Sequence, residues 1–173
     1  MTKEQQQKAA YLAQEVLRLS RDSIIMNMRF LDAALSAMRP VSQPGLKGVA
    51  ADGESFRYDD AFVLRRYKGE PAYIARCCLH SLLHLVLYHP FCYGDVETKY
   101  CDISADIAVE NVILEMDLHF LKIHRDTERK AEGAALKIKC GALTAEKIYR
   151  YLMKEKPDEE ELAGLKLLFH RDE

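Results

Sequence analysis

The sequence predicts an α+β domain that is mostly α-helical, on the basis of three observations. Most of the chain consists of segments in which apolar residues recur with a helical period. The main β signal is one short hairpin, and residues 77–90 form an almost wholly apolar segment that predicts a buried helix. We therefore expect one domain over residues 1–173, with the small hairpin or sheet beside this helix.

Composition narrows the classes of function. The formal net charge is −2, which gives no overall attraction to nucleic acid or to an anionic membrane, and we expect neither as a partner. The sequence contains no run of about 18 apolar residues, so we expect no membrane-spanning segment. The cysteines lack the Cys-x-x-Cys spacing of a zinc knuckle, and we expect reduced, mostly buried thiols in a cytoplasmic protein. They are Cys77, Cys78, Cys92, Cys101 and Cys140.

The N-terminal part predicts two successive helices. The first covers residues 4–20, with one face expected to be buried. That face is made by Ala9, Leu12, Val16 and Leu19. Asp22 or Ser23 can cap a second helix over residues 23–38, because their side chains accept hydrogen bonds from the first backbone N–H groups of a helix. The residues expected to point inward from it are Ile24, Met28, Leu31 and Leu35. Pro40 and Pro44 then prevent the helix from continuing.

Residues 47–58 predict a hairpin that turns at Asp52-Gly53. Two interpretations stay open for it. It is either an edge strand beside the apolar helix, where a peptide backbone can pair, or a surface hairpin that covers the core.

The remaining helices follow from caps and apolar periodicity. Asp59 or Asp60 caps a short helix through Tyr67, and the apolar helix begins near Glu70-Pro71 and ends before Pro90. Further helices are expected at residues 100–116, 144–153 and from 158 onward. Residues 90–99 predict a loop, and residues 125–141 predict a weak helix or a loop.

The apolar helix contains His80 and His84, which are four residues apart and therefore share one helix face. Two imidazoles at this spacing can bind one metal ion, as in the zincin motif His-Glu-x-x-His. The alternative is a pair of hydrogen-bonded core histidines. Burying both without partners costs about 1–3 kcal/mol each, so this spacing in an apolar helix favours a metal.

Two candidates for the third ligand remain open. Asp102, Asp106 and Glu110 form an acidic stripe on the next apolar helix, and like charges at this spacing repel unless a cation faces them. A metal, an Arg or a Lys would supply that cation. The alternative is that the stripe is a solvent-exposed face without a functional role. We favour Asp106 as the third ligand with Asp102 supporting it. His89 lies roughly 140° around the helix from His84 if the helix persists, and it is either a supporting residue or the third ligand.

Ser81 occupies the position of the zincin glutamate. In a metallopeptidase this Glu is the general base that deprotonates the attacking water, and a serine hydroxyl is far too weak a base for that step. Loss of a general base lowers the rate about 10²–10⁴-fold. Glu110 or Asp102 could substitute for it through space. Ser81 in the middle of a helix lacks the exposed turn of a serine nucleophile.

At these residues the chain resembles a bacterial metallopeptidase-like domain that precedes a von Willebrand factor A-like domain. The resemblance covers most of the chain and rests on several segments. They are Arg21-Asp22-Ser23, Phe30-Leu31, Ala51-Asp52-Gly53, His80 to Pro90, and Ala105 to Val109 with Asn111. It implies a zincin-like fold with zinc at His80, His84 and Asp106, and a longer protein that continues after Phe169–Glu173. Family members have Glu where this chain has Ser81, so peptidase activity is not implied.

Three functions remain open at this point. The first is a zinc-binding domain derived from a metallopeptidase, with weak or no peptide hydrolysis and a binding or scaffolding role beside a von Willebrand factor A-like partner. The second is an active hydrolase of peptides or proteins that uses another carboxylate as its base. The third is a metal-free helical interaction domain. The chain also has a weaker similarity to a ribosomal-RNA maturation endoribonuclease family, which has the motif His-Gly-x-x-His followed by a third His. The similar residues here are His80-Ser81-Leu82-Leu83-His84 and His89.

Overall fold

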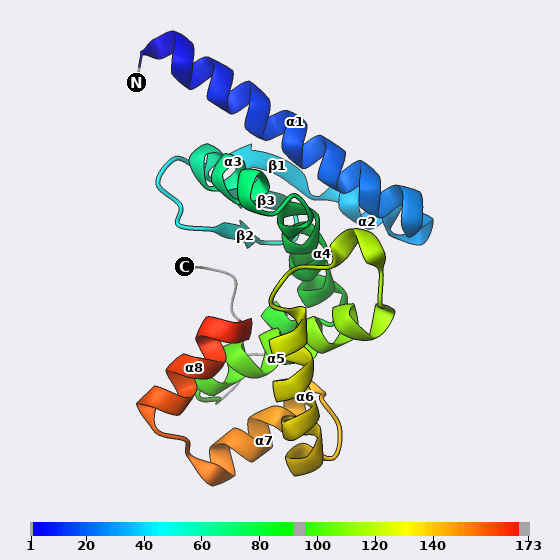
Figure 1. Ribbon diagram of the computed structural model, residues 1–173, viewed down its shortest axis with the longest axis vertical. Coiled ribbons are helices and arrows are strands. Elements are labelled where there is room, and N and C mark those ends of the chain that lie inside the picture. The colour runs from blue at the N-terminus through cyan, green and yellow to red at the C-terminus, as the bar shows by residue number, and fades with distance from the viewer. Residues whose placement is uncertain (1, 92–95, 170–173) are drawn as a thin grey trace. The chain divides into compact units, whose positions relative to one another are not determined.

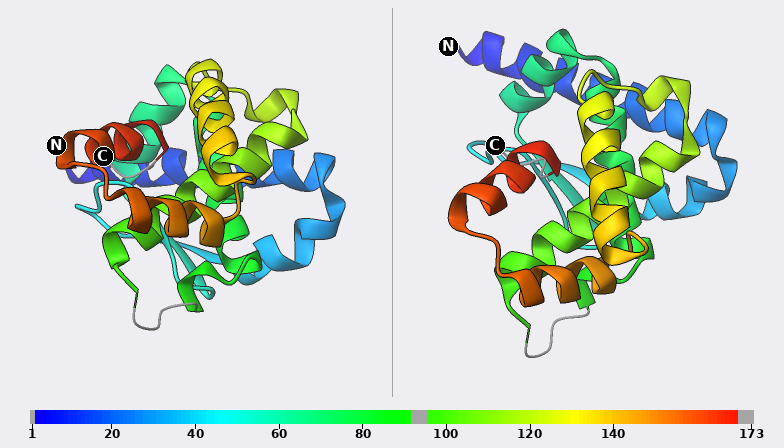
Figure 2. Two further views of the ribbon diagram at one scale, coloured as in Figure 1. Left: turned by 90° about the horizontal axis from the view of Figure 1, so that it is seen from below. Right: turned by 60° about the horizontal axis from the view of Figure 1, so that its bottom comes forward.

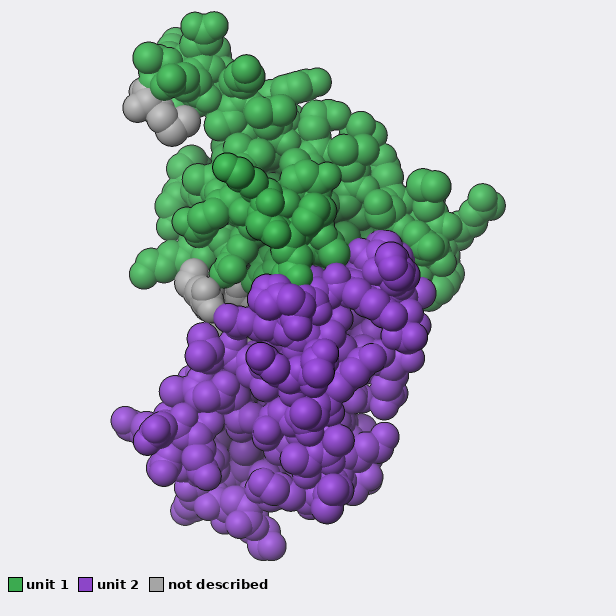
Figure 3. All heavy atoms as spheres, viewed as in Figure 1, with its two compact units in different colours: residues 1–86, 172–173 green, residues 87–171 purple. Residues whose placement is uncertain are grey.

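A computed structural model describes residues 2–91 and 96–169 of the chain, without the side chain of Phe91. The chain forms two compact units, unit 1 (residues 1–86) and unit 2 (residues 87–171), which Figure 3 distinguishes by colour. Helices dominate and the described strands form one small sheet, so the predicted α+β, mostly α-helical class is confirmed. The predicted passage into a further domain after Phe169 and the thiol of Cys92 lie outside the described residues.

Unit 1 combines helices with a three-stranded sheet (Figure 1). Its elements are α1 (Lys3–Asn27), the 3₁₀ turn η1 (Arg29–Leu31), α2 (Asp32–Ala37), β1 (Arg39–Ser42), β2 (Val49–Ala51), β3 (Ser55–Tyr58), α3 (Asp60–Gly69) and α4 (Ala72–Val86). α1 packs against both α3 and α4, and α4 also contacts β2. Asp59 caps α3 by accepting a hydrogen bond from the Phe62 N–H at 2.8 Å, so this predicted cap is confirmed.

The hairpin predicted at residues 47–58 is the antiparallel pair β2–β3. Gly53 adopts a φ of 93°, which few other residues tolerate. Asp52 closes the turn, because its carboxylate accepts hydrogen bonds from the Ser55 N–H and hydroxyl, both at 2.8 Å. The hydrogen bond from the Ser55 backbone is the largest of the effects that lower the pKa of Asp52 to about 2. The hairpin also lies beside α4, since a Cβ added at Gly53 would be 4.0 Å from a methyl carbon of Leu85.

β1 is a strand that the sequence did not predict. It pairs in parallel with β3, opposite β2, so the sheet order is β1-β3-β2. All four of its residues are exposed, so no alternation of apolar and polar residues marks it. Pro40 is compatible with this strand because β1 is an edge, where a missing N–H breaks no ladder.

The predicted break between two helices at Asp22-Ser23 is wrong, because α1 runs without interruption to Asn27. The two expected capping side chains interact within the helix instead. Arg18 donates to the Asp22 carboxylate at 2.8 Å, and the Ser23 hydroxyl donates to the Leu19 carbonyl at 3.0 Å. The single helix begins at a different cap, a capping box formed by Thr2 and Gln5.

The face that α1 buries also differs from the prediction. Leu12 and Leu19 are 43% and 47% exposed. The buried residues lie one position further along, at Ala13, Leu17, Ser20 and Ile24. Both the predicted and the observed set of residues recur with the helical period. Because α1 is one unbroken helix, the face that is buried is the one that continues to Ile24. The inward residues predicted for the second segment, from Ile24 to Leu35, are all buried and confirm that part of the prediction.

Unit 2 is helical and centred on α5 (Thr98–Met116). Its other elements are η2 (His89–Phe91), η3 (His119–Leu121), α6 (Asp126–Cys140), α7 (Ala145–Glu155) and α8 (Glu159–Phe169). α6, α7 and α8, coloured yellow to red in Figure 2, all contact α5. They bury an apolar core that includes Ile103, Ile107, Ile148 and Leu152. Thr144 caps α7 as predicted, accepting a hydrogen bond from the Lys147 N–H.

Residues 125–141 form a full helix, α6, where the sequence predicted a weak helix or a loop. Its ends have the charges that stabilise a helix dipole, with Asp126 and Glu128 in the first turn and Lys137 and Lys139 in the last. Gly141 follows with a φ of 78°, a common conformation after the end of a helix. These terminal signals predict the helix better than its weak apolar period does.

Two compositional expectations can be compared with the described residues. No helix in residues 2–91 and 96–169 is both long and apolar enough to cross a membrane. The four described cysteines are thiols that form no disulfide with each other. Cys77 and Cys78 are buried, and Cys101 and Cys140 are half-buried.

We expect Leu17→Ala to lower the free energy of unfolding by about 2–5 kcal/mol, because Leu17 is 1% exposed and its loss leaves a cavity against α3 and α4. Leu12→Ala is the matched control on the same helix and should change stability by less than about 1 kcal/mol. Urea unfolding followed by circular dichroism measures both. Equal effects of the two variants would contradict the burial of this face.

Candidate metal centre

α4 presents the histidines from a helix that is buried on nearly every side. No Gly or Pro interrupts residues 72–86, and most of its side chains are apolar. The buried positions are Ile74 to His80, Leu82 and Leu83. The helix ends at Val86, before Pro90 as predicted, and Tyr88 then takes a left-handed φ of 61°. Burial of this helix leaves its polar side chains few directions in which to find partners.

His80 and His84 lie together on one face of α4, as their spacing predicts. His80 is 6% exposed and His84 is half-buried. Their Nε2 atoms are 2.8 Å apart and their ring centroids 4.6 Å apart. Two nitrogens at this distance form a hydrogen bond in which one ring donates and the other accepts. Two imidazole ligands of a tetrahedral zinc ion at about 2.0–2.1 Å would be about 3.3 Å apart, so a small outward shift of the rings is enough to bind a metal.

The acidic stripe on α5 separates into three environments. Asp102 is exposed, Asp106 is 6% exposed and Glu110 is fully buried. Asp106 belongs with His80 and His84 to a set of side chains that could hold a metal ion. Two imidazoles and one carboxylate are a donor set that suits zinc and leaves a coordination position open. The donor chemistry of these residues therefore fits the predicted metal.

Glu110 is engaged in a buried ion pair. Its Oε2 accepts a hydrogen bond at 2.9 Å from Nη1 of Arg129, and the two side chains are 0% and 2% exposed. Arg129 also donates from Nε to the Leu168 carbonyl at 2.8 Å, which joins α5, α6 and α8 within unit 2. A carboxylate in this position has no access to solvent, so Glu110 is poorly suited to serve as a general base. Arg129 supplies the cation that the stripe required.

The other two predicted residues lie in different elements, Ser81 within α4 and His89 in η2, after α4 has ended. Ser81 is half-buried and directly follows His80. His89 is in η2 and belongs to unit 2. The pKa of Glu146 at the start of α7 is lowered, first by hydrogen bonds from its own backbone N–H and from Thr144 and further by the charge of His89. His89 therefore has an acidic neighbour within unit 2.

Two buried arginines were missed at the level of sequence. Arg129 is in the charged segment that the sequence predicted as a weak helix or loop, and its partner is 19 positions away, so no local pattern reveals it. Arg76 is 1% exposed on α4, one helical turn before His80. Its position among apolar residues was a usable signal, because an arginine in a buried helix requires a polar partner.

We expect Glu110→Gln to lower the free energy of unfolding by about 3–5 kcal/mol, because the variant leaves the Arg129 charge buried without its anion. Glu115→Gln is the matched control on the same helix. Glu115 is 61% exposed and its nearest ion-pair contact, to Lys137, is 3.7 Å, so this variant should stay within about 1 kcal/mol. Thermal and urea unfolding measure both, and a stable Glu110→Gln protein would overturn the structural role of the pair.

A comparison with known protein families finds a match for the chain. The family model described as "Putative metallopeptidase domain" matches residues 14–167, a span that includes α4, α5 and all three donor residues. No curated protein and no solved structure matches the chain. The predicted resemblance to a metallopeptidase-like domain is confirmed, and the chain belongs to this metallopeptidase domain family.

Proposed function

We propose that the chain is a zinc-binding, metallopeptidase-like domain in which peptide hydrolysis is weak or absent. The observation that supports it most is the pair of ring nitrogens of His80 and His84, side by side on a buried helix in a member of a metallopeptidase domain family. In such a protein, burial of two adjacent imidazoles is favourable when an ion or a hydrogen bond satisfies both. A bound zinc ion would supply Lewis-acid chemistry at this site.

Asp106 is the third ligand in this proposal. Its carboxylate is buried and, together with His80 and His84, belongs to a group of side chains that could hold a metal ion. His89, the other candidate, has Glu146 as its charged neighbour instead. Asp102 is exposed and one turn away along α5, and it would act as a supporting residue. Carboxylate and imidazole ligands together favour zinc over magnesium or calcium, which prefer oxygen ligands alone.

Ser81 sets the limit on catalysis. A serine at this position offers a hydroxyl where a metallopeptidase needs a carboxylate to accept the proton of water. We therefore propose a binding or scaffolding role, with a peptide or protein ligand and a von Willebrand factor A-like domain as partner in a longer bacterial protein. A cytoplasmic setting is part of this proposal, because the five cysteines of the sequence do not have the paired spacing of a disulfide framework.

An active hydrolase with a substitute base is the second candidate, and the structure narrows it. Glu110 is paired with Arg129 and buried, so of the two carboxylates predicted as substitute bases, Asp102 is the one that solvent reaches. Asp102 belongs to the same helix as Asp106, one turn earlier. This candidate therefore rests on one exposed side chain.

Metal content tests the donor set directly. We expect about one zinc per chain in untagged wild-type protein after incubation with zinc and dialysis, and loss of that zinc in His80→Ala/His84→Ala, because a single carboxylate holds zinc weakly. Elemental analysis measures both. The matched control is His119→Ala/His124→Ala, which removes two exposed histidines of unit 2 and should leave the zinc in place. A wild-type protein that takes up no zinc would overturn the proposal and leave a metal-free helical domain.

The role of Ser81 is tested by restoring the carboxylate. We expect Ser81→Glu to raise zinc-dependent peptidase activity about 10²–10⁴-fold over a wild type with little or none, because it returns the general base. Cleavage of a quenched fluorescent peptide library measures this. Ser81→Gln has nearly the same shape without the charge and should stay inactive. If the wild type already cleaves peptides and loses this in both His84→Ala and Asp102→Asn, the active hydrolase is the correct reading.

A further inference from the structure

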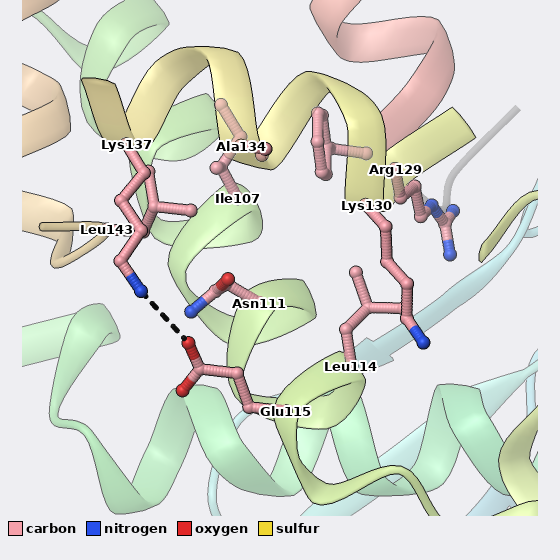
Figure 4. A pocket seen from close by; sticks show the side chains of 11 residues that line it. Ile107, Asn111, Leu114, Glu115, Arg129, Lys130, Ala134, Lys137 and Leu143 are labelled. Carbon is pink, nitrogen blue, oxygen red and sulfur yellow. Dashed lines mark ion pairs between the residues drawn. The ribbon is translucent and has the colours of Figure 1, made fainter. Parts of the chain in front are cut away.

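Unit 2 contains a pocket that the proposed zinc site does not use. It lies between α5 and α6 and has a volume of about 200 Å³ (Figure 4). Its lining combines apolar side chains with a few polar ones. The residues that matter for the argument are Ile107, Asn111, Lys130, Gly133, Ala134 and Lys137.

The pocket is open because α6 has small residues where it faces the cavity. Gly133 is buried, and a Cβ added there would meet Cδ1 of Leu143 at 3.5 Å, which is an ordinary contact. Packing therefore does not require glycine at this position. Ala134 follows it, and Ile107 and Leu143 form apolar walls. An apolar group of compact shape would replace water against these walls with a gain in free energy.

The rim is cationic. Lys130 and Lys137 line the pocket with a single carboxylate, Glu115, and the charge of Arg129 is already met by Glu110. The ion pairs of the two lysines are long, 3.7 Å from Lys137 to Glu115 and 3.8 Å from Lys130 to Asp117, and all four side chains are more than half exposed. Such pairs are weak, so both ammonium groups can turn towards a ligand. Figure 4 shows the Asn111 side chain close to the Lys137–Glu115 ion pair, and Lys130 on the same helix as Lys137, α6.

We propose that this pocket binds a small monocarboxylate with a compact apolar body, such as an aromatic ring or a branched chain. The carboxylate would pair with Lys130 or Lys137 and accept a hydrogen bond from the Asn111 amide, and the apolar body would lie against Ile107 and Leu143. A cavity of about 150 Å³ holds a benzene molecule, so a ring with one carboxylate matches this volume. Larger, drug-sized ligands need about 300–1,000 Å³ and do not fit.

The test is a titration of ¹⁵N-labelled full chain with benzoate, followed by chemical-shift changes in two-dimensional NMR spectra. Benzoate should shift amide signals of α5 and α6 with a Kd of about 1 mM, a value in keeping with the few atoms of the ligand. Benzamide has the same shape without the charge and should bind at least about 10-fold more weakly. Absence of benzoate-induced shifts in α5 and α6, or equal binding of the two probes, would overturn the proposal.

Two pairs of variants localise the binding. Ala134→Leu fills the cavity and should abolish benzoate binding, and Ala131→Leu makes the same change at an exposed position of α6 outside the lining and should bind as the wild type does. Lys130→Gln/Lys137→Gln should weaken benzoate at least about 10-fold and leave benzamide unchanged. Lys147→Gln/Lys154→Gln on α7 is its control and should change neither. Benzoate binding that survives in Ala134→Leu would place the ligand elsewhere and refute the site. The outcome is independent of zinc, because none of these residues belongs to the donor set.

Discussion

The burial of α4 is the constraint on which the candidate site depends. A helix whose side chains are mostly apolar folds into the interior, and its polar groups must then be satisfied where they stand. Because His80 and His84 are one turn apart, burial brings their ring nitrogens to 2.8 Å from each other. One proton can bridge two imidazoles, and one metal ion can do the same with both rings neutral. The fold thus prepares the pair for either partner, and a carboxylate in the donor set favours the metal because it adds the charge that an ion needs.

Two buried carboxylates on α5 have different roles, because one stabilises the fold through an ion pair and the other is a candidate metal ligand. Glu110 and Asp106 are one turn apart and both are buried. Arg129 pairs with Glu110 and also donates to the Leu168 carbonyl, so one guanidinium links three helices of unit 2. The guanidinium of Arg129 does not lose its proton in proteins, so the Arg129–Glu110 pair keeps its cation at every ordinary pH. Asp106 is the acidic residue of the stripe that is buried and belongs to a donor set, which a solvated face would not explain.

The sequence predicts best what depends on local geometry. Residues four apart on a helix share a face whatever the tertiary structure, so the His80–His84 pair was predictable, as were the caps at Asp59 and Thr144. The buried face of α1 was not, because stripes through Leu12 and Leu17 both have helical period and only the packing against α3 and α4 chooses between them. For the same reason, strand β1 and the burial of Arg129 were not predicted, because tertiary contacts determine both. Their pairing partners are far along the chain, and neither has a local pattern of its own.

In the proposed function, metal binding and hydrolysis would depend on different residues of α4, so that one could be lost without the other. The imidazoles of His80 and His84 supply donor atoms, whereas a base at position 81 would supply a proton acceptor. Ser81 is half-buried and small, so it disturbs neither the packing of the helix nor the contact between the two rings. Under the proposed function, a serine at this position differs from a glutamate in its chemistry, because it has neither the negative charge nor the proton acceptor of a carboxylate. Under the proposed function, these donor residues would hold an ion without a base at position 81, and a carboxylate introduced there would supply the proton acceptor that hydrolysis needs.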